Sequence, residues 1–408
     1  MTASMAQPVL AADSKTTLDV IISQYGTQTQ AWWSQFEKDF ETENPDIDLN
    51  IEIVSWNDLY TKVNTLVANN NAPDILNIDV LADYVADDLL MPATEYASED
   101  LQSKFFPAFW DASTIDDTVY ALPILASCRA LFYNKDILDE AGYTIDDLTD
   151  ITWSKFMEIG KDVHEKTGKY LLTSEATGGD TLMMMMQSCG ANFVNEDGEA
   201  YIVGNDVAEK CINLYVDLVK NDVVKLVNNW DEYIATITGG EAAGIVNGNW
   251  ITATLMATED QKGLWQITTM PKVDGVDTAT NYANNGGSSW YITSNCKNVE
   301  LAEDFLASTF GSSTDFYDAI LPETGAISCY LPAGESDVYN EPSEFFNNQP
   351  IFSTIVEYSS HIPEFTKTPY HYEARECINT AVVNIVNGAD KESALQEAQD
   401  TLAFKMTE

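Results

Sequence analysis

Residues 18–79 decide the fold and read "LDVIISQYGTQTQAWWSQFEKDFETENPDIDLNIEIVSWNDLYTKVNTLVANNNAPDILNID". Strand and helix patterns alternate along this stretch, with strands expected at 18–26, 47–56 and 72–79 and helices at 29–45 and 57–70. The first helix carries aromatic side chains from Trp32 to Phe40 at helical spacing. The pair Asn57/Asp58 is the expected cap of the second helix. A β-α-β-α-β order implies a parallel sheet with crossover helices.

The rest of the chain continues in the same alternating style. A strand is expected from Ala130 to Tyr133, helices at 152–168 and 206–222, and another strand that ends in "GIVNGNW" at Gly244–Trp250. A length of 408 residues exceeds what one ordinary core fills, so two lobes are expected. No repeat or low-complexity linker separates them, which favours several chain crossings over a single tether.

The balance of charge narrows the possible partners. The chain has 20 basic and 65 acidic residues and a formal net charge of −45. Such a surface repels nucleic acids and anionic membranes, so no nucleic-acid partner is expected. No segment is long and apolar enough for a membrane helix. We interpret residues 1–15, which end near the small-residue pattern "VLAA", as a tag or a leader remnant.

Neither metal nor cofactor is indicated by the sequence. The six cysteines are widely separated, and none pairs with the three histidines at zinc-site spacing. Up to three disulfides are possible by number, but a chain of this size does not need them, and free, mostly buried thiols are the preferred interpretation. The four consecutive methionines Met183–Met186 are expected to fill a core.

Trp250 stands directly after a strand and an Asn-Gly turn, and this position suggests a role. Parallel sheets bind ligands beyond the carboxyl ends of their strands. Sugars offer apolar C–H faces to aromatic rings and polar rims to amides, carboxylates and arginines. We therefore expect Trp250 to be a stacking platform for a sugar, with packing in a lobe core as the alternative.

Seven segments, taken in order, resemble the extracellular solute-binding proteins of carbohydrate ABC transporters. They include "FEKDFETENPDIDLNIEIVSWNDLYTKV", "YALPILASCRALFYNKDILDEAG", "GEAAGIVNGNW" and "NGGSSWYITSNCKNVELAEDFL", and the resemblance covers residues 18 to about 405. It implies a two-lobed α/β fold of the periplasmic-binding-protein type (type II), with mixed sheets flanked by helices and a ligand cleft between the lobes. The lobes are expected at 16–125 plus 285–325 and at 126–284 plus 326–408.

The resemblance also implies a function and a location. A mono- or oligosaccharide is bound outside the cell and delivered to the permease subunits of an ABC importer by hinge closure, without catalysis. The chain is expected to be a monomer, either lipid-anchored on a cell surface or periplasmic. A glycoside hydrolase, or a binding protein for a peptide, a polyamine or a metal, is the alternative. No nucleophile elbow or phosphate-binding loop supports an enzyme.

Further site residues carry over from the family position by position. The candidates besides Trp250 are Tyr25, Gln28, Asp79, Ser127, Arg129, Asp180, Gly286, Gly287, Trp290, Tyr372 and Arg375. The two glycines are expected to let backbone approach the ligand, and Trp290 is either a platform or a core residue.

Ser127 and Arg129 mark a departure from the family pattern. Where maltose-binding members offer a glutamate, this chain has Ser127, followed two residues on by Arg129. The change argues against maltose and suggests a different arrangement of hydroxyls or an acidic sugar. An arginine fork suits a ligand carboxylate, but Arg129 can equally pair with an acid of the protein itself.

Overall fold

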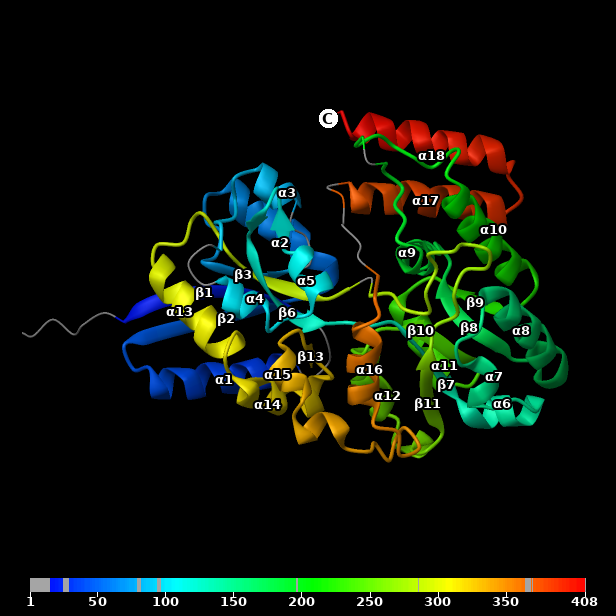
Figure 1. Cartoon of the computed structure of the whole chain (residues 1–408), viewed down its shortest axis with the longest axis horizontal. Helices are drawn as coiled ribbons and strands as arrows, with labels where there is room; N and C mark the ends of the chain where they lie inside the picture. Colours follow the sequence, from blue (N-terminus) through cyan, green and yellow to red (C-terminus); the bar gives the residue numbers. More distant parts are fainter. Residues whose placement is uncertain are drawn as a thin grey trace, which may run out of the picture.

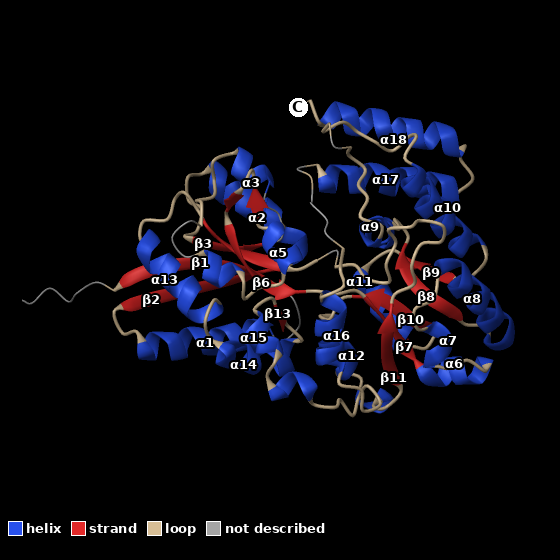
Figure 2. Ribbon diagram, in the orientation of Figure 1, coloured by secondary structure: helices blue, strands red, loops and turns tan. Residues whose placement is uncertain are grey.

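The computed structural model describes residues 15–24, 29–78, 82–93, 97–195, 197–284, 286–363, 368 and 370–407. Figures 1 and 2 show two lobes side by side, each built on its own sheet with helices around it. The α/β fold with mixed sheets flanked by helices is therefore as predicted. Among the described residues no helix has the length and hydropathy to cross a membrane.

The first lobe contains a six-stranded sheet in the order β13-β6-β12-β3-β1-β2. Its strands are β1 (Thr16–Ser23), β2 (Ile47–Val54), β3 (Ile75–Ile78), β6 (Ala121–Ala126), β12 (Ser288–Ile292) and β13 (Ile327–Ser328). The strands β2, β1 and β3 run parallel, and the other three join antiparallel. The quoted stretch thus forms the β-α-β-α-β unit that its pattern predicts.

Helices surround this first sheet, and a short hairpin forms a separate two-stranded sheet. They are α1 (Thr29–Glu43), α2 (Trp56–Ala68), α3 (Ala82–Ala86), α4 (Glu99–Gln102), α5 (Pro107–Asp111), α13 (Val299–Phe310), α14 (Thr314–Thr324) and α15 (Leu331–Gly334). The hairpin joins β4 (Thr114–Ile115) to β5 (Thr118–Val119). The predicted Asn57/Asp58 cap is wrong, because α2 begins at Trp56 with Ser55 at the N-cap, and Asp58 lies in the first turn.

The second lobe contains a five-stranded sheet in the order β11-β7-β10-β8-β9. Its strands are β7 (Ala130–Asn134), β8 (Tyr170–Glu175), β9 (Val224–Val227), β10 (Ala242–Asn247) and β11 (Trp265–Thr269). The strands β10, β8 and β9 are parallel, whereas β7 runs antiparallel to both β10 and β11. The carboxyl ends of β8, β9 and β10 therefore share one edge with the start of β7.

The remaining helices belong mainly to this second lobe. They are α6 (Lys135–Ala141), α7 (Ile145–Leu148), α8 (Trp153–Thr167), α9 (Gly179–Ser188), α10 (Asp206–Lys220), α11 (Trp230–Thr238), α12 (Ile251–Met256), α16 (Ile351–Ser359), α17 (His371–Val386) and α18 (Lys391–Lys405), with short 3₁₀ turns at Glu259–Gln261 and Asp337–Asn340. Figure 1 places α12 and α16 between the lobes. Met183–Met186 lie buried in α9, as predicted.

The chain crosses between the two sheets more than once. Residues 127–129 join β6 to β7, and residues 270–287 lead from β11 back to β12. The two crossings are tied together, since the Arg129 amide donates to the Ala283 carbonyl at 2.7 Å. The expected lobe boundary at residue 325 falls before β13, yet β13 pairs with β6 in the first sheet. We keep the division into lobes as a proposal, with β13 counted in the first.

Two of the predicted features concern side chains in the cores. All six cysteines are free thiols, five of them buried and Cys296 half-buried, in agreement with the preferred interpretation. Trp290 is fully buried in the first lobe, where it stacks on Phe310 with ring centroids 4.8 Å apart and meets Trp33 edge-on. Of its two alternatives, the burial of Trp290 favours the core residue over the platform.

Candidate functional site

The candidate site lies where the first crossing enters the second sheet. Asn247, at the end of β10, pairs with Ala130, at the start of β7. Arg129, one residue before that strand, is consequently held next to the β10 turn that carries Trp250. The turn arises as predicted, because Asn247-Gly248-Asn249 ends the strand and Trp250 becomes the N-cap residue of α12.

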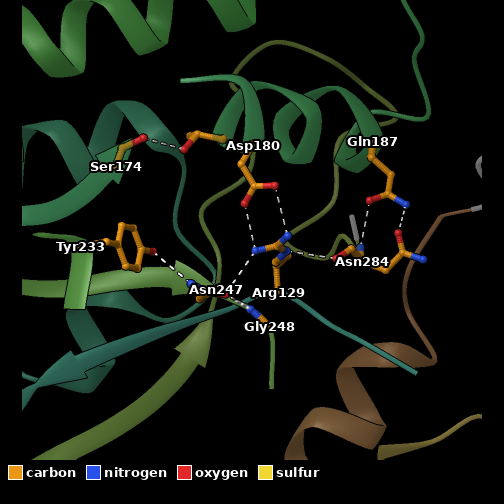
Figure 3. A network of polar contacts seen from close by, with 9 residues as sticks. Arg129, Ser174, Asp180, Gln187, Tyr233, Asn247, Gly248 and Asn284 are labelled. Carbon is orange, nitrogen blue, oxygen red and sulfur yellow. Dashed lines mark hydrogen bonds and ion pairs between the residues drawn. The ribbon is translucent and has the colours of Figure 1, made fainter. Parts of the chain in front are cut away.

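Arg129 is the centre of a polar network shown in Figure 3. Its guanidinium forms a two-pronged contact with the Asp180 carboxylate, with N–O distances of 3.1 and 3.3 Å. Nη1 also donates to the Asn247 Oδ1 at 3.3 Å, and Nε donates to the Asn284 carbonyl at 3.1 Å. Only 4 % of Arg129 is exposed, compared with 34 % of the Asp180 side chain. A buried guanidinium needs such partners to offset its lost hydration.

This network answers one question that the sequence left open. Arg129 pairs with an acid of the protein, so its donors are directed at Asp180 and the two asparagines. Breaking that arrangement to bind a ligand carboxylate would leave Asp180 uncompensated. The geometry thus favours a structural role for the Arg129 fork at the junction of the lobes.

Trp250 lies directly against this cation. The Arg129 guanidinium carbon is 4.7 Å from the centroid of the indole, a cation–π contact, and Trp250 is half-buried. Such contacts contribute about 0.5–2 kcal/mol and fix the orientation of the ring. Trp250 is therefore not a fully buried core side chain, and part of its surface remains accessible.

Two glycines make room for this indole. A Cβ atom at Gly248 would lie 2.2 Å from Trp250 Cζ3, and one at Gly286 would lie 2.8 Å from Trp250 Cη2. Larger residues at either position would displace the ring. Gly286 therefore admits the side chain of Trp250, a contact that the sequence did not suggest. Gly287 has φ +98°, a backbone conformation that L-residues rarely adopt, at the entry to β12.

Ser127 is the third residue of this cluster. It is 1 % exposed, and its Oγ would lie 3.1 Å from a Cβ placed on Gly286. Within the described part of the chain its hydroxyl has no hydrogen-bond partner. Buried polar groups are normally paired, so this hydroxyl is a candidate contact for a ligand. Ser127, Gly286 and Trp250 thus come together from both crossings and the second lobe.

Other predicted residues lie further from this cluster or outside the described residues. Tyr372, in the first turn of α17, faces Tyr60 of α2 with ring centroids 6.1 Å apart, which is a contact between the two lobes. Arg375 is half-buried one turn further along. Three further candidates, namely Tyr25, Gln28 and Asp79, fall outside the described residues and stay predictions.

Arg375 acts electrostatically on Glu175, which ends β8. Burial raises the pKa of the Glu175 carboxyl above its usual value, and the Asp180 charge adds to this rise, while Arg375 and Arg129 oppose it. Glu175 and Asp180 together make the second-lobe side of the site acidic. Sequence analysis missed Glu175, although it ends a parallel strand, the position that the strand-end argument predicts for a ligand contact.

Residues that support the site were also missed. The backbone N–H of Asn284 donates to the Gln187 Oε1 of α9 at 2.9 Å, and the Gln187 side-chain amide donates to the Asn284 Oδ1. Tyr233 of α11 accepts from Asn247 Nδ2 at 3.2 Å. The "NGNW" and "NNGG" motifs contain both asparagines, but only the fold shows that they converge on Arg129.

The comparisons with known proteins fit this architecture. The family model described as bacterial extracellular solute-binding protein matches residues 25–309. The chain belongs to the bacterial extracellular solute-binding protein family. It is 30 % identical over 368 residues to a lactose-binding protein of Rhizobium radiobacter. The alignment covers 89 % of this chain and 87 % of that relative. The family and this relative are binding proteins, so this solute-binding protein is not an enzyme.

Solved structures confirm the fold of this solute-binding protein. The GacH receptor of Streptomyces glaucescens, solved unliganded and with acarbose, superposes with a TM-score of 0.80 at 17 % identity, covering 96 % of this chain and 99 % of that one. A transporter-associated binding protein of Bifidobacterium animalis subsp. lactis, solved with β-1,6-galactobiose, gives 0.77 at 21 % identity, covering 97 % and 98 %. The predicted two-lobed fold is confirmed by these matches.

Proposed function

We propose that this solute-binding protein binds a neutral mono- or oligosaccharide outside the cell and delivers it to the permease subunits of an ABC importer. The observation that carries the proposal is the half-buried Trp250 ring, held against Arg129 at the end of a parallel strand. An indole so oriented suits the C–H face of a sugar. The lactose-binding relative, aligned over most of the chain, supports the same ligand class.

A neutral sugar suits the charges around Trp250 better than an acidic one. Arg129 is occupied by Asp180, and Glu175 adds a second carboxylate nearby. A ligand carboxylate would meet these acids without a cation directed at it. Hydroxyl groups, in contrast, both donate to carboxylates and accept from groups such as the Ser127 hydroxyl. Of the two alternatives suggested by Ser127 and Arg129, the proposal therefore adopts the different arrangement of hydroxyls and not the acidic sugar.

The transport role implies hinge motion, a location and an oligomeric state. A ligand that touches both lobes binds the closed arrangement best and shifts the population towards it. The rings of Tyr60 in α2 and Tyr372 in α17 form a contact between the lobes, across which such a motion would act. We further propose that the protein acts as a monomer, anchored by a lipid on the cell surface or free in a periplasm.

Calorimetry with a panel of neutral sugars, acidic sugars, peptides and polyamines tests the proposal. We expect heat of binding from at least one neutral sugar and no release of hydrolysis products. Small-angle scattering should show a smaller radius of gyration with the saturating sugar than without it. Binding of uronic acids alone would contradict the neutral ligand class, and binding of peptides or polyamines alone would contradict sugar transport. A radius of gyration that does not change on binding would contradict hinge closure.

A further inference from the structure

Trp230 is an exposed aromatic residue with an unusual position. It is 45 % exposed, whereas every other tryptophan whose side chain the structure describes is buried or half-buried. Trp230 begins α11, three residues after Val227 ends β9. Single exposed apolar residues are common on protein surfaces. The position and surroundings of Trp230, rather than its exposure, carry the argument.

The position is on the same edge of the second sheet as the Arg129 network. The parallel strands β8, β9 and β10 end at Glu175, Val227 and Asn247. At this edge the first crossing from the other lobe enters β7 beside Asn247. Trp230 therefore follows a strand end on the side of the second lobe where Trp250 follows another.

The Trp230 ring is held flat by a partner that is itself fixed. It stacks on Tyr233 with centroids 5.3 Å apart and an angle of 9° between the ring planes. Tyr233 is buried, and its hydroxyl accepts from Asn247, which in turn accepts from Arg129. Tyr233 covers one face of the indole, so the exposed area belongs to the opposite face and the edges. A ring fixed in this way loses little conformational entropy when a ligand stacks on it.

Polar residues flank Trp230 in the sequence. Asn228, Asp231 and Glu232 are all exposed. Glu232 accepts hydrogen bonds from both the backbone and the side-chain amide of Asn228, at 2.8 and 3.1 Å. An exposed aromatic face on a segment that also exposes amides and carboxylates has the kinds of group that bind a pyranose or furanose ring.

We infer that Trp230 is a second stacking platform, which holds a further sugar ring of an oligosaccharide whose first ring lies on Trp250. The inference rests on the proposed function and extends it, because it assigns the ligand a length of at least two rings. The platform is linked to the first through Tyr233, Asn247 and Arg129, so the two indoles are fixed relative to each other.

Titration with short and long sugars tests the second platform. The probes are galactose, lactose, β-1,6-galactobiose and arabinose oligomers of one to four units. We expect Trp230→Ala to weaken the longer sugars by about 3- to 12-fold and to leave the shortest sugar that binds unchanged. Trp230→Phe should restore most of the affinity. Phe404→Ala, which removes an aromatic side chain 63 % exposed on α18, is the matched control and should change nothing.

The same titrations separate the failure of this inference from failure of the proposed function. If Trp230→Ala leaves all sugars unchanged, or weakens short and long sugars equally, the second platform is wrong even though sugar binding stands. If the parent protein binds none of the sugars, the proposed function fails and the second platform fails with it. A parent that binds only monosaccharides also contradicts the second platform.

Chemical protection gives a readout that is independent of affinity. N-bromosuccinimide oxidises accessible indoles, and peptide mass spectrometry locates the oxidised residues. We expect Trp230 to be oxidised readily in the free protein and to be protected by the longest sugar that binds. The shortest sugar should protect Trp250 but not Trp230. Equal oxidation of Trp230 with and without the long sugar would overturn the inference.

Discussion

Trp250 and Trp290 follow similar sequences but have different surroundings. "NGNW" ends at Trp250 and "NNGGSSW" ends at Trp290, so each tryptophan comes shortly after an Asn-Gly pair in the sequence. Trp250 follows a strand, lies against Arg129 and is half-buried. Trp290 lies inside β12, between β3 and β6, and is fully buried. Trp250 therefore lies beyond the end of its strand and next to the site, whereas Trp290 lies within a central strand and in the core.

The largest effect on stability is expected from Trp290→Ala. The indole packs against Phe310 and Trp33 in the first lobe, so its loss leaves a cavity that costs about 3–5 kcal/mol of unfolding free energy. Chemical denaturation measures this cost directly. The midpoint should fall strongly, and ligand affinity, measured well below the new melting temperature, should change little. A stable variant with impaired binding would reverse the assignment of the two tryptophans.

Trp250→Ala is expected to have the opposite profile. Loss of a stacked sugar face removes about 1.5–3 kcal/mol of binding free energy, about a 10- to 150-fold loss of affinity. Calorimetry with the best sugar and thermal melting without ligand give the two quantities. Because the ring is only half-buried, the melting temperature should fall much less than in Trp290→Ala. Unchanged affinity, or a collapse of stability, would contradict the platform.

A smaller effect is expected from Gly286→Ala, which alters Trp250 without removing it. The new Cβ would lie 2.8 Å from Cη2 of the indole and 3.1 Å from the Ser127 Oγ, so the ring has to shift. We expect an affinity loss of up to about tenfold, equivalent to about 1.4 kcal/mol. Gly334→Ala, whose Cβ would meet Val356 at an ordinary 3.4 Å, is the control. Equal affinities of the two variants would show that the position of the Trp250 ring is unimportant.

The smallest effect concerns pH and the acidic surroundings of the Trp250 site. Burial raises the pKa of Glu175 above its ordinary value of 4.5, so the folded protein holds this proton more tightly than the unfolded chain. The contribution of this tighter proton binding to the stability of the fold is complete below pH 4.5. It is lost as the pH rises through the higher pKa of Glu175 in the folded protein. Glu175→Gln should flatten the stability profile in the interval just above pH 4.5. The melting temperatures of the two proteins are measured across this pH interval. If they change with pH in the same way, the raised pKa of Glu175 is contradicted.

Several features were predictable because they depend on local pattern. The strand and helix order of residues 18–79 follows from the spacing of apolar residues, and the Asn-Gly turn fixes the end of β10. The burial of Met183–Met186 follows from a continuous apolar run. The cap of α2 was misplaced because Ser55, Asn57 and Asp58 are all possible capping residues and the sequence alone does not rank them.

The site was only partly predictable, since its contacts join residues distant in sequence. Ser127, Arg129, Asp180, Trp250 and Gly286 were identified from strand ends and from family resemblance. Asn247 and Asn284 were not distinguished from ordinary turn residues. No sequence pattern singled out Trp230 as a site residue. Their roles depend on the pairing of β7 with β10, which brings residue 130 beside residue 247.

The sequence by itself determined the kinds of side chain available and the local elements that carry them, because periodicity and turn chemistry act over a few residues. It determined an acidic, two-lobed binding protein with Trp250 at a strand end. Only the tertiary structure decided that Arg129 faces Asp180 instead of a ligand, and that Trp290 is buried while Trp250 stays accessible. Burial and ion pairing depend on which strands become neighbours in the sheets. That strand order in turn depends on chain crossings that lie more than a hundred residues apart in the sequence.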